Sequence, residues 1–434
     1  MAIPARSPAG AEGTKGAVAA SGSREHLEVD LVVRAIEASE LPAFVRADGI
    51  GFGEDSSEML ANLGGFISED LDRTRAAFEG DDIVGTSRNH SFELTVPGGA
   101  QIPAAGLSAV AVLPTHRRRG VLRSMMTATF DDAVQRGESV SMLTASEGGI
   151  YGRFGFGVST FAQSLAVDVR AAEFAPPRPA GRARFVEPDE LRKHAPSIYD
   201  DMRRSTPGVL SRTDGWWSDV QVDRRRKQPR FDVLWESSTG VVDGFVTYTI
   251  DAKWEPEPAH VLSICDLIGR TPDAIHALWR FLCEIDLVGT VKDSAVAIDS
   301  PLPWLLTSAR AVKTTSVHDY VWTRVLDVPA ALGSRTYGVD GRVAIAVHDA
   351  IYEGGAADGS FLVDGGPDGA SVQRTTQRAD LECDVATLSA AWLGGVRWST
   401  LAAAGLVVER SAGALATADA MFASTPLPFP YTWF

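Results

Sequence analysis

The sequence has little cysteine, and its few thiols are widely spaced. Its 434 residues include three cysteines, and Cys265, Cys283 and Cys383 stand far apart without a C-x-x-C spacing. This spacing predicts buried free thiols and neither a disulfide framework nor a zinc site. His116 has no second ligand three or four residues further on, so we expect no bound metal.

The sequence also lacks an excess of positive charge and long apolar runs. Lysine and arginine number 41 against 56 aspartates and glutamates, which gives a net charge of −15. Nucleic acids and anionic membrane surfaces attract basic patches, so an acidic chain is a poor partner for either. No apolar run reaches the length of about 18 residues that a membrane span needs, and the N-terminus has no apolar core of a signal peptide. We therefore expect a cytoplasmic protein that binds neither nucleic acid nor a membrane.

One stretch, residues 103–157, has a pattern typical of phosphate binding. An apolar run over 107–113 predicts a strand, apolar residues at spacings of three and four over 121–134 predict a helix, and 139–145 predicts a second strand. Three arginines and Gly120 lie in the loop before the helix. The N–H groups and dipole of a helix start attract an anion, and arginines add charge. The loop is therefore a predicted phosphate site.

The motifs of this loop narrow the class of ligand. Neither G-x-x-x-x-G-K-[ST] nor G-x-G-x-x-G occurs here, which argues against a P-loop NTPase and a dinucleotide fold. The loop reads Arg117-x-x-Gly120-x-Leu122. It resembles the [QR]-x-x-G-x-[GA] pyrophosphate loop of GCN5-related N-acetyltransferases (GNATs), which cradles coenzyme A. The last position departs from that pattern, with leucine for glycine or alanine.

The longer string is more specific. VAVLPTHRRRG followed by SEGGIYGRFGFG is similar to the enhanced intracellular survival (Eis) acetyltransferases of actinobacteria. SPLPWLLTSAR from Ser300, DVPAAL from Asp327 and STLAAAG from Ser399 match as well. The resemblance covers roughly Leu27 to Phe434.

Composition and resemblance together predict an α/β (α+β) fold in three domains. Residues 1–25 are Ala-, Gly-, Ser- and Pro-rich and are expected to be a disordered tail. Residues 26–175 are the predicted catalytic GNAT domain, bounded by a stiff Pro-rich linker. Residues 182–322 repeat its element order without the arginine cluster, and so predict a degenerate GNAT-like domain. Residues 323–434 read as strands followed by helices, and the resemblance implies a domain like a sterol carrier protein.

Three local predictions concern the first domain. Residues 36–46 suggest a helix, and residues 50–55 a turn-rich loop ahead of an amphipathic stretch over 57–66. Residues 161 and 164–169 are expected to form a strand that closes the first sheet.

Two residues are candidates for proton transfer. Tyr151 follows the second strand of the crevice, where a phenol could protonate a departing thiolate, and the resemblance assigns it the role of general acid. The chain ends in Trp433 and Phe434, and an aromatic terminus is unusual for a frayed tail. Burial of both rings would hold the terminal carboxylate inside the protein. The resemblance implies that this carboxylate is the proton acceptor.

The resemblance also indicates which residues bind acetyl-CoA. The strand would contribute main-chain groups, the loop and helix start would bind the phosphates, and two residues would lie across the crevice. These positions are Val110, Ala111, Val112, Arg118, Arg119, Gly120, Val121, Leu122, Arg123, Ser146 and Glu147.

Glu54 and Asp55 lie where the family places its amine pocket, and they could attract a cationic acceptor. We therefore expect direct transfer from acetyl-CoA to a primary amine of an aminoglycoside-like molecule, a polyamine or a lysine side chain. The resemblance further implies a homohexamer. One alternative stays open: a lipid- or sterol-binding or scaffold protein whose acetyltransferase unit is vestigial.

Overall fold

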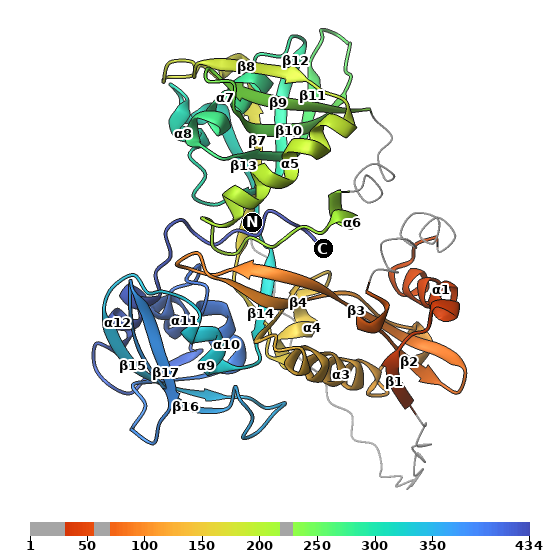
Figure 1. Ribbon diagram of the computed structural model, residues 1–434, viewed down its shortest axis with the longest axis vertical. Helices are drawn as coiled ribbons and strands as arrows, with labels where there is room; N and C mark the ends of the chain where they lie inside the picture. Colours follow the sequence, from red (N-terminus) through yellow and green to blue (C-terminus); the bar gives the residue numbers. More distant parts are fainter. Residues whose placement is uncertain (1–30, 56–69, 218–228) are drawn as a thin grey trace, which may run out of the picture.

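The computed structural model describes residues 31–55, 70–217 and 229–434. The predicted disordered tail, 1–25, and the predicted amphipathic stretch at 57–66 lie outside these residues. Three β-sheets organise the described chain into three units, which Figure 1 shows as one unit above and two below.

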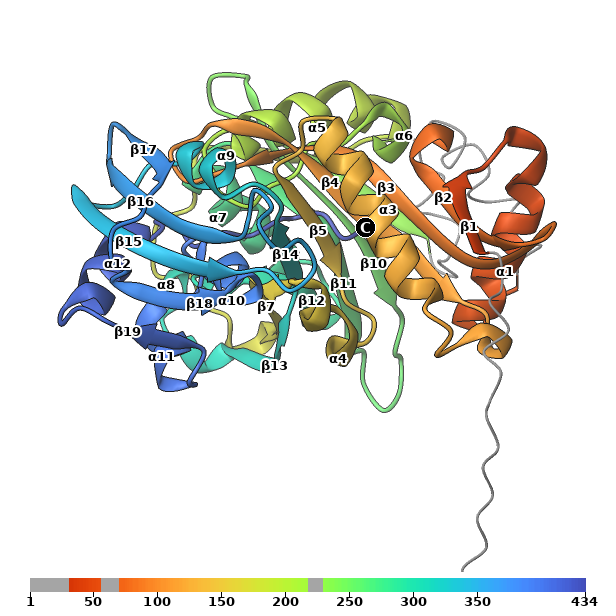
Figure 2. The same cartoon turned by 90° about the horizontal axis from the view of Figure 1, so that it is seen from below.

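The first unit is built on a seven-stranded sheet. In spatial order its strands are β1 (Leu31–Ala35), β2 (Thr74–Glu79), β3 (Asp82–Thr95), β4 (Gln101–Val112), β5 (Val140–Thr144), β14 (Val321–Val325) and β6 (Gly157–Val158). Its helices are α1 (Leu41–Phe52), α3 (Val121–Gln135) and α4 (Gly148–Tyr151). Helix α3 covers the face of the sheet that is turned away from the second unit (Figures 1 and 2).

Helix α3 confirms the apolar spacing that predicted it. Its buried side chains include Val121, Met125, Met126 and Phe130, which recur every three or four residues and pack on the sheet. Gly137, with φ of 77°, lies in the left-handed turn that follows the helix. The helix thus begins directly after the glycine loop, as expected.

Helix α1 differs from its prediction. It begins at Leu41, five residues later than expected, and runs to Phe52, which takes in the first three residues of the segment 50–55 that we expected to be a loop. A Cβ on Gly51 would lie 2.4 Å from the Cβ of Ala111, so only glycine lets the helix pack this closely on β4. Tertiary packing overrides the low helix propensity of glycine here. The helix ends at Gly53, whose φ is 72°.

The second unit also contains a seven-stranded sheet. In spatial order its strands are β13 (Val312–Asp319), β7 (Phe161–Asp168), β12 (Val288–Ala297), β11 (His260–Gly269), β10 (Val242–Asp251), β9 (Arg230–Ser237) and β8 (Gly181–Phe185). Its helices are α5 (Pro188–Arg203), α6 (Asp214–Trp217), α7 (Pro272–Cys283) and α8 (Leu302–Leu305).

The first two units exchange strands. Strand β7 pairs with β12 and β13 of the second sheet, so the prediction that residues 161–169 close the first sheet is wrong. Strand β14, from the far end of the second segment, instead lies between β5 and β6 of the first sheet. Alternating apolar residues predict a strand but do not specify which sheet takes it. The exchange joins the two units through paired backbone.

The third unit has a five-stranded sheet. In spatial order its strands are β17 (Gly369–Arg374), β16 (Gly359–Gly366), β15 (Gly341–His348), β18 (Leu381–Asp384) and β19 (Val407–Glu409). Its helices are α9 (Val328–Gly333), α10 (Val385–Ala391), α11 (Trp398–Ala403) and α12 (Ala414–Phe422). The predicted strands and helices of this region are present, although α9 precedes the strands and the short β19 lies between two helices. After α12 the chain leaves this unit and ends between the first and second units (Figure 1).

Candidate active site

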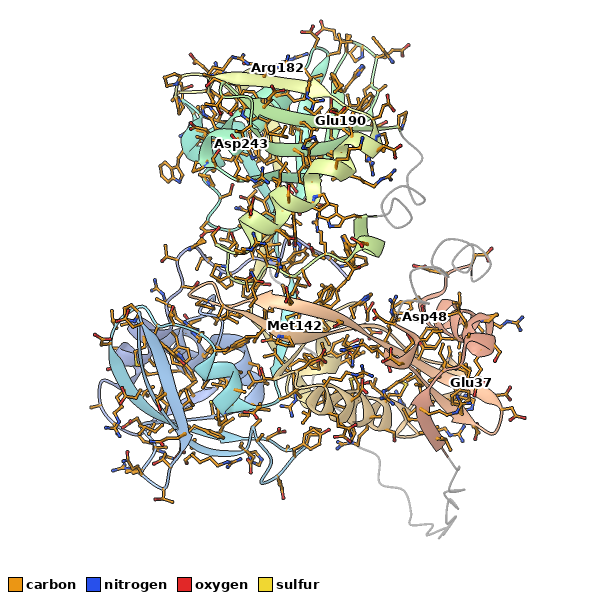
Figure 3. All side chains as sticks on the ribbon, in the orientation of Figure 1. Glu37, Asp48, Met142, Arg182, Glu190 and Asp243 are labelled. Atoms are coloured by element: carbon orange, nitrogen blue, oxygen red, sulfur yellow. The ribbon has the colours of Figure 1, made fainter. Side chains whose placement is uncertain are left out.

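The site is organised around a divergence of β4 and β5. Ala109 has φ of 51°, and the register of β4 on β3 shifts there, so β4 bends away at a β-bulge. The pairing of β4 with β5 covers two residue pairs, Ala105 with Ser141 and Gly106 with Met142. Figure 3 shows Met142 near the centre of the first unit. Residues 110–112 therefore present main-chain groups along an open strand edge, as the prediction of main-chain cofactor contacts requires.

The glycine loop has the conformation that an anion site needs. Gly120 is the N-cap of α3 with φ of 84°, and a Cβ there would meet no atom within 4 Å. A glycine cap has no side chain to bond the first N–H groups of the helix, which leaves them to a ligand. Arg118 is exposed in this loop, with φ of 64°. The residues present thus fit a pyrophosphate.

Two side chains of the loop, His116 and Arg119, contact Glu79 at the end of β2. Nε2 of His116 lies 2.5 Å from one carboxylate oxygen, and a guanidinium nitrogen of Arg119 lies 2.7 Å from the other. These bonds, that of Arg119 first, lower the pKa of Glu79. His116 thus holds the loop in place, whereas Arg118 extends from it and forms no ion pair with any carboxylate among the described residues.

A cavity of about 960 Å³ opens between the first sheet, the second unit and the C-terminal segment. The predicted site residues that line it are Glu54, Val110, Ser146, Tyr151 and Phe434. Asp55 is exposed and is not part of this lining, and Glu147 is an exposed N-cap of α4. The structure therefore brings the two proton-transfer candidates into one cavity beside the open edge of β4.

Tyr151 is a buried side chain at the end of α4. It is 5% exposed and packs edge-on against Phe156, with ring centroids 5.9 Å apart. Burial, and to a lesser extent the charge of Glu147, raises the pKa of Tyr151 to about 12. The phenol therefore keeps its proton throughout the neutral range.

Phe434 is buried and tethered. Its ring packs edge-on against Phe92, with centroids 5.0 Å apart, and the hydroxyl of Thr144 donates a 2.7 Å hydrogen bond to its main-chain oxygen. The expected burial of Trp433 is wrong, because that side chain is 62% exposed while Phe434 is 8% exposed. Both residues line the cavity, but only Phe434 is buried there.

Sequence reasoning missed four carboxyl groups that line the cavity: Asp48, Asp266, Asp293 and Asp299. Asp48 of α1, placed in Figure 3 at the end of the first unit farthest from the third, accepts a 3.3 Å hydrogen bond from Thr86. Burial raises the pKa of Asp48 to about 6 and that of Asp293 in β12 to about 7. Asp48 was missed because the apolar pattern predicted a helix over 36–46, whereas the observed helix α1 extends to Phe52 and includes Asp48. Asp293 belongs to the second unit, where no motif indicated a site.

Four arginines also line the cavity, and each is paired with a carboxylate. The pairs are Arg88 with Asp70, Arg192 with Asp189, Arg212 with Asp266 and Arg230 with Asp232. Asp48, Glu54, Asp293 and Asp299 add acidic groups to the lining. Because the positive charges of the arginines are already paired and the lining holds further acidic groups, the cavity favours a ligand with positive charge.

No helix in the ranges 31–55, 70–217 and 229–434 is long and apolar enough to cross a membrane. The same ranges contain no group of three or more His, Cys, Asp or Glu placed to hold a metal ion.

Comparison with known families defines the class of protein. Residues 32–159 and 208–325 each match the acetyltransferase (GNAT) domain family, and residues 328–430 match the sterol carrier protein domain family. A GCN5-related N-acetyltransferase from Anabaena variabilis, 17% identical, shares the fold with a TM-score of 0.80 over 93% of this chain and 100% of the other. The chain is therefore an N-acetyltransferase with the predicted architecture, and this fold implies acetyl-CoA as co-substrate.

More similar proteins identify the family. The chain is 35% identical to N-acetyltransferase Eis of Mycobacterium tuberculosis over 80% of this chain and 84% of the relative. It is 37% identical to an uncharacterized N-acetyltransferase of Streptomyces griseus over 92% of this chain and 99% of that protein. The crystal structure of Eis1 from Mycobacterium abscessus superimposes with a TM-score of 0.81 at 31% identity, over 93% of this chain and 100% of the other. The chain belongs to the Eis family of N-acetyltransferases, as its motifs predicted.

Proposed function

We propose that this protein transfers the acetyl group of acetyl-CoA directly to a primary amine of a cationic acceptor, in a ternary complex. The acceptor is an aminoglycoside-like molecule, a polyamine or a lysine side chain. The observation that carries the proposal is the enclosure of Tyr151 and Phe434 in one cavity at the open edge of β4.

The two residues have complementary roles in this proposal. The terminal carboxylate of Phe434 accepts a proton from the amine that attacks the thioester carbonyl. As the carbon–sulfur bond breaks, Tyr151 donates its phenolic proton to the departing thiolate. A phenol whose pKa is about 12 is protonated at neutral pH, as a donor must be. Holding amine and thioester side by side removes the need for a covalent enzyme intermediate.

The co-substrate would lie along β4 and the glycine loop. Val110, Ala111 and Val112 offer main-chain groups to the pantetheine arm. Residues 118–123 offer N–H groups and guanidinium charge to the phosphates. Ser146 and Glu147 lie across the crevice. The dipole of α3 favours the same anion.

Buried carboxyl groups support a cationic acceptor. The raised pKa values of Asp48 and Asp293 show that burial disfavours their charged forms. An ammonium group placed beside them would restore that charge. Glu54 lines the same cavity, and Asp55 at its exposed edge would act by attracting cations from solvent.

The alternative of a lipid-binding protein has less support. The interior of the third unit is filled by Trp392, Trp398 and Phe422, which are all at most 1% exposed. Arg335, also 1% exposed, donates a 2.9 Å hydrogen bond to the main-chain oxygen of Phe422 within that interior. A buried guanidinium among packed rings is a poor lining for an alkyl chain.

The assembly and location form part of the same proposal. We propose a homohexamer on the family resemblance, and we propose a cytoplasmic location, in keeping with acetyl-CoA as co-substrate. Light scattering should give six times the chain mass of 46.3 kDa. A chain mass at micromolar concentration would contradict the hexamer.

The activity is tested with acetyl-CoA and a panel of amines. Thiol release should require both the enzyme and an amine, and should be fastest with polycationic amines. Neutral amines of similar size are the matched control. Tight binding of fatty acids or sterols, together with no thiol release from any amine, would instead favour the lipid-binding alternative.

A further inference from the structure

The last residues of the chain are held mainly by the second unit, although Phe434 lies against the first. Phe429 donates its N–H to the main-chain oxygen of Pro207 at 2.9 Å, and its ring stacks on Tyr320 with centroids 5.6 Å apart. Gly208 has φ of 87°, and a Cβ there would lie 2.8 Å from the Phe429 nitrogen. The tail therefore crosses the second unit at very close range.

Arg212 is the centre of the contacts closest to the chain end. It donates hydrogen bonds to the main-chain oxygen of Tyr431 at 2.8 Å and to the hydroxyl of Thr432 at 3.0 Å. Its remaining guanidinium nitrogen contacts Asp266 of β11 at 2.5 Å. The Arg212 side chain is 6% exposed, so these bonds form with little competition from water.

Tyr199 of α5 completes this group of contacts, which we call the tail clamp: Tyr199, Arg212, Asp266 and Thr432. The Tyr199 hydroxyl lies 2.8 Å from that of Thr432, and the Arg212 guanidinium lies 4.1 Å from the centre of the Tyr199 ring. Tyr199 is fully buried and Thr432 is 1% exposed. The planar guanidinium can bond the tail and the carboxylate at once, because its donors form a fixed fork.

We propose that Arg212 is a positioning residue for catalysis: through the tail clamp it sets where the Phe434 carboxylate stands beside Thr144. The inference rests on the proposed role of that carboxylate as proton acceptor. Two residues separate the clamp at Thr432 from the end of the chain, so a loosened clamp lets the carboxylate move by several ångströms. The second unit, which lacks the arginine loop, thereby contributes to catalysis in the first.

The first test asks whether the clamp holds the tail. Carboxypeptidase should release Phe434 and Trp433 slowly from the unaltered protein and at least ten times faster from Arg212→Met, as followed by mass spectrometry. Thr432→Val is the second variant, because it removes the tail's bonding partner while leaving Arg212 paired with Asp266. The matched control is Arg270→Met, since Arg270 also bonds an aspartate and a main-chain oxygen in the second unit but does not contact the tail. Equal release rates from all three variants would overturn the clamp.

The second test links the clamp to turnover. Arg212→Met and Thr432→Val should lower kcat about 10- to 100-fold with unchanged KM for acetyl-CoA, whereas Arg270→Met should retain normal kcat. A glycine added after Phe434 displaces the carboxylate by itself. In that extended chain Arg212→Met should lower kcat less than twofold further, because both changes act on one group.

The outcomes separate failure of the inference from failure of the proposed function. If the glycine-extended chain turns over normally, Phe434 is not the base, and the proposed function loses its proton acceptor whatever the clamp does. If the glycine extension lowers kcat, but Arg212→Met lowers kcat by the same factor in the extended chain as in the unextended chain, Phe434 remains the proton acceptor and the positioning role of Arg212 is wrong. The Arg212→Lys variant should have a kcat between those of Arg212→Met and the unaltered protein, and this result would support the positioning role. Lysine keeps the positive charge that pairs with Asp266, but it lacks the forked guanidinium donors that also bond the tail.

Discussion

The hydroxyl of Thr144 donates a 2.7 Å hydrogen bond to the main-chain oxygen of Phe434, across 290 residues of sequence. Thr144 is the last residue of β5, one of the two diverging strands. The bond therefore places the end of the chain at the opening through which the thioester would enter.

Adding one glycine after Phe434 should abolish most turnover. The added residue moves the terminal charge by up to about 3.6 Å, and a misplacement of about 1 Å can cost roughly 100-fold in rate. Steady-state kinetics should show a large fall in kcat, while calorimetry shows normal acetyl-CoA affinity and the melting temperature changes little. Normal kcat in the extended protein would make the terminus purely structural.

Replacing Tyr151 by phenylalanine should lower kcat by about 10²- to 10⁴-fold without weakening acetyl-CoA binding. The ring and its packing on Phe156 remain, and only the donated proton is lost. Because burial raises the pKa of Tyr151 to about 12, the unaltered enzyme should show no loss of rate from ionisation of this group up to pH 10. A Tyr151→Phe enzyme with an unchanged pH–rate profile and kcat would assign the proton to another donor.

Arg118 should contribute more to acetyl-CoA affinity than Arg119, whose guanidinium is paired with Glu79 at 2.7 Å. We expect Arg118→Gly to weaken binding by about 1.5–3 kcal/mol for a lost charged hydrogen bond. Glycine suits this position because φ is 64° there, so the loop keeps its shape. Arg119→Ala is the matched comparison, and isothermal titration gives both affinities. Unchanged affinity in the double replacement of Arg118 and Arg119 would place the phosphates elsewhere.

Asp48→Asn should stabilise the protein above pH 6. Burial raises the pKa of Asp48 from 3.8 to about 6, so the folded state binds a proton that the unfolded state releases. Stability from this group therefore increases as the pH falls from 6 toward 4, and is lowest above 6. Ionised Asp48 lowers the free energy of unfolding at neutral pH by about 3 kcal/mol at most.

Melting curves from pH 4 to 8 test the Asp48 prediction. The variant should melt higher than the unaltered protein at pH 7–8, and the gap should close near pH 4. A variant that melts lower at every pH would contradict it. KM for cationic amines should rise at the same time, because a carboxylate of the cavity is lost.

The buried ion pair between Arg324 of β14 and Asp349 of the third unit should be sensitive to removal of one partner. The two groups are 2.6 Å apart and at most 1% exposed. Arg324→Met should destabilise the protein by about 3–5 kcal/mol, because Asp349 is left as an unpaired buried charge. Arg324→Met combined with Asp349→Leu should recover much of that loss. Thermal melting of the single and the double variant tests this prediction. An equal loss of stability in the two variants would show that the unpaired charge of Asp349 is not the cause.

The local pattern of the sequence was sufficient for much of the fold. The apolar spacing in α3 and the glycines that bound it predicted a helix directly after a glycine loop, and the structure has both. Such features depend on neighbouring residues, whose spacing is visible along the chain. Tyr151 was found for the same reason, since it lies within the motif that carries the family resemblance.

Features that depend on distant contacts required the tertiary structure. Strand β7 reads as an ordinary strand and β14 was not predicted, and only pairing shows that each belongs to the other unit's sheet. Gly51 reads as a helix breaker, yet the close approach of Ala111 keeps it in α1.

Likewise, nothing near Arg212 in the sequence indicates that it bonds Tyr431 and Thr432. The sequence by itself predicted most of the elements and the family, and it singled out Tyr151 and Phe434 as candidates for proton transfer. The tertiary structure decided which surfaces meet, because buried pairing energies arise only when distant segments are brought together.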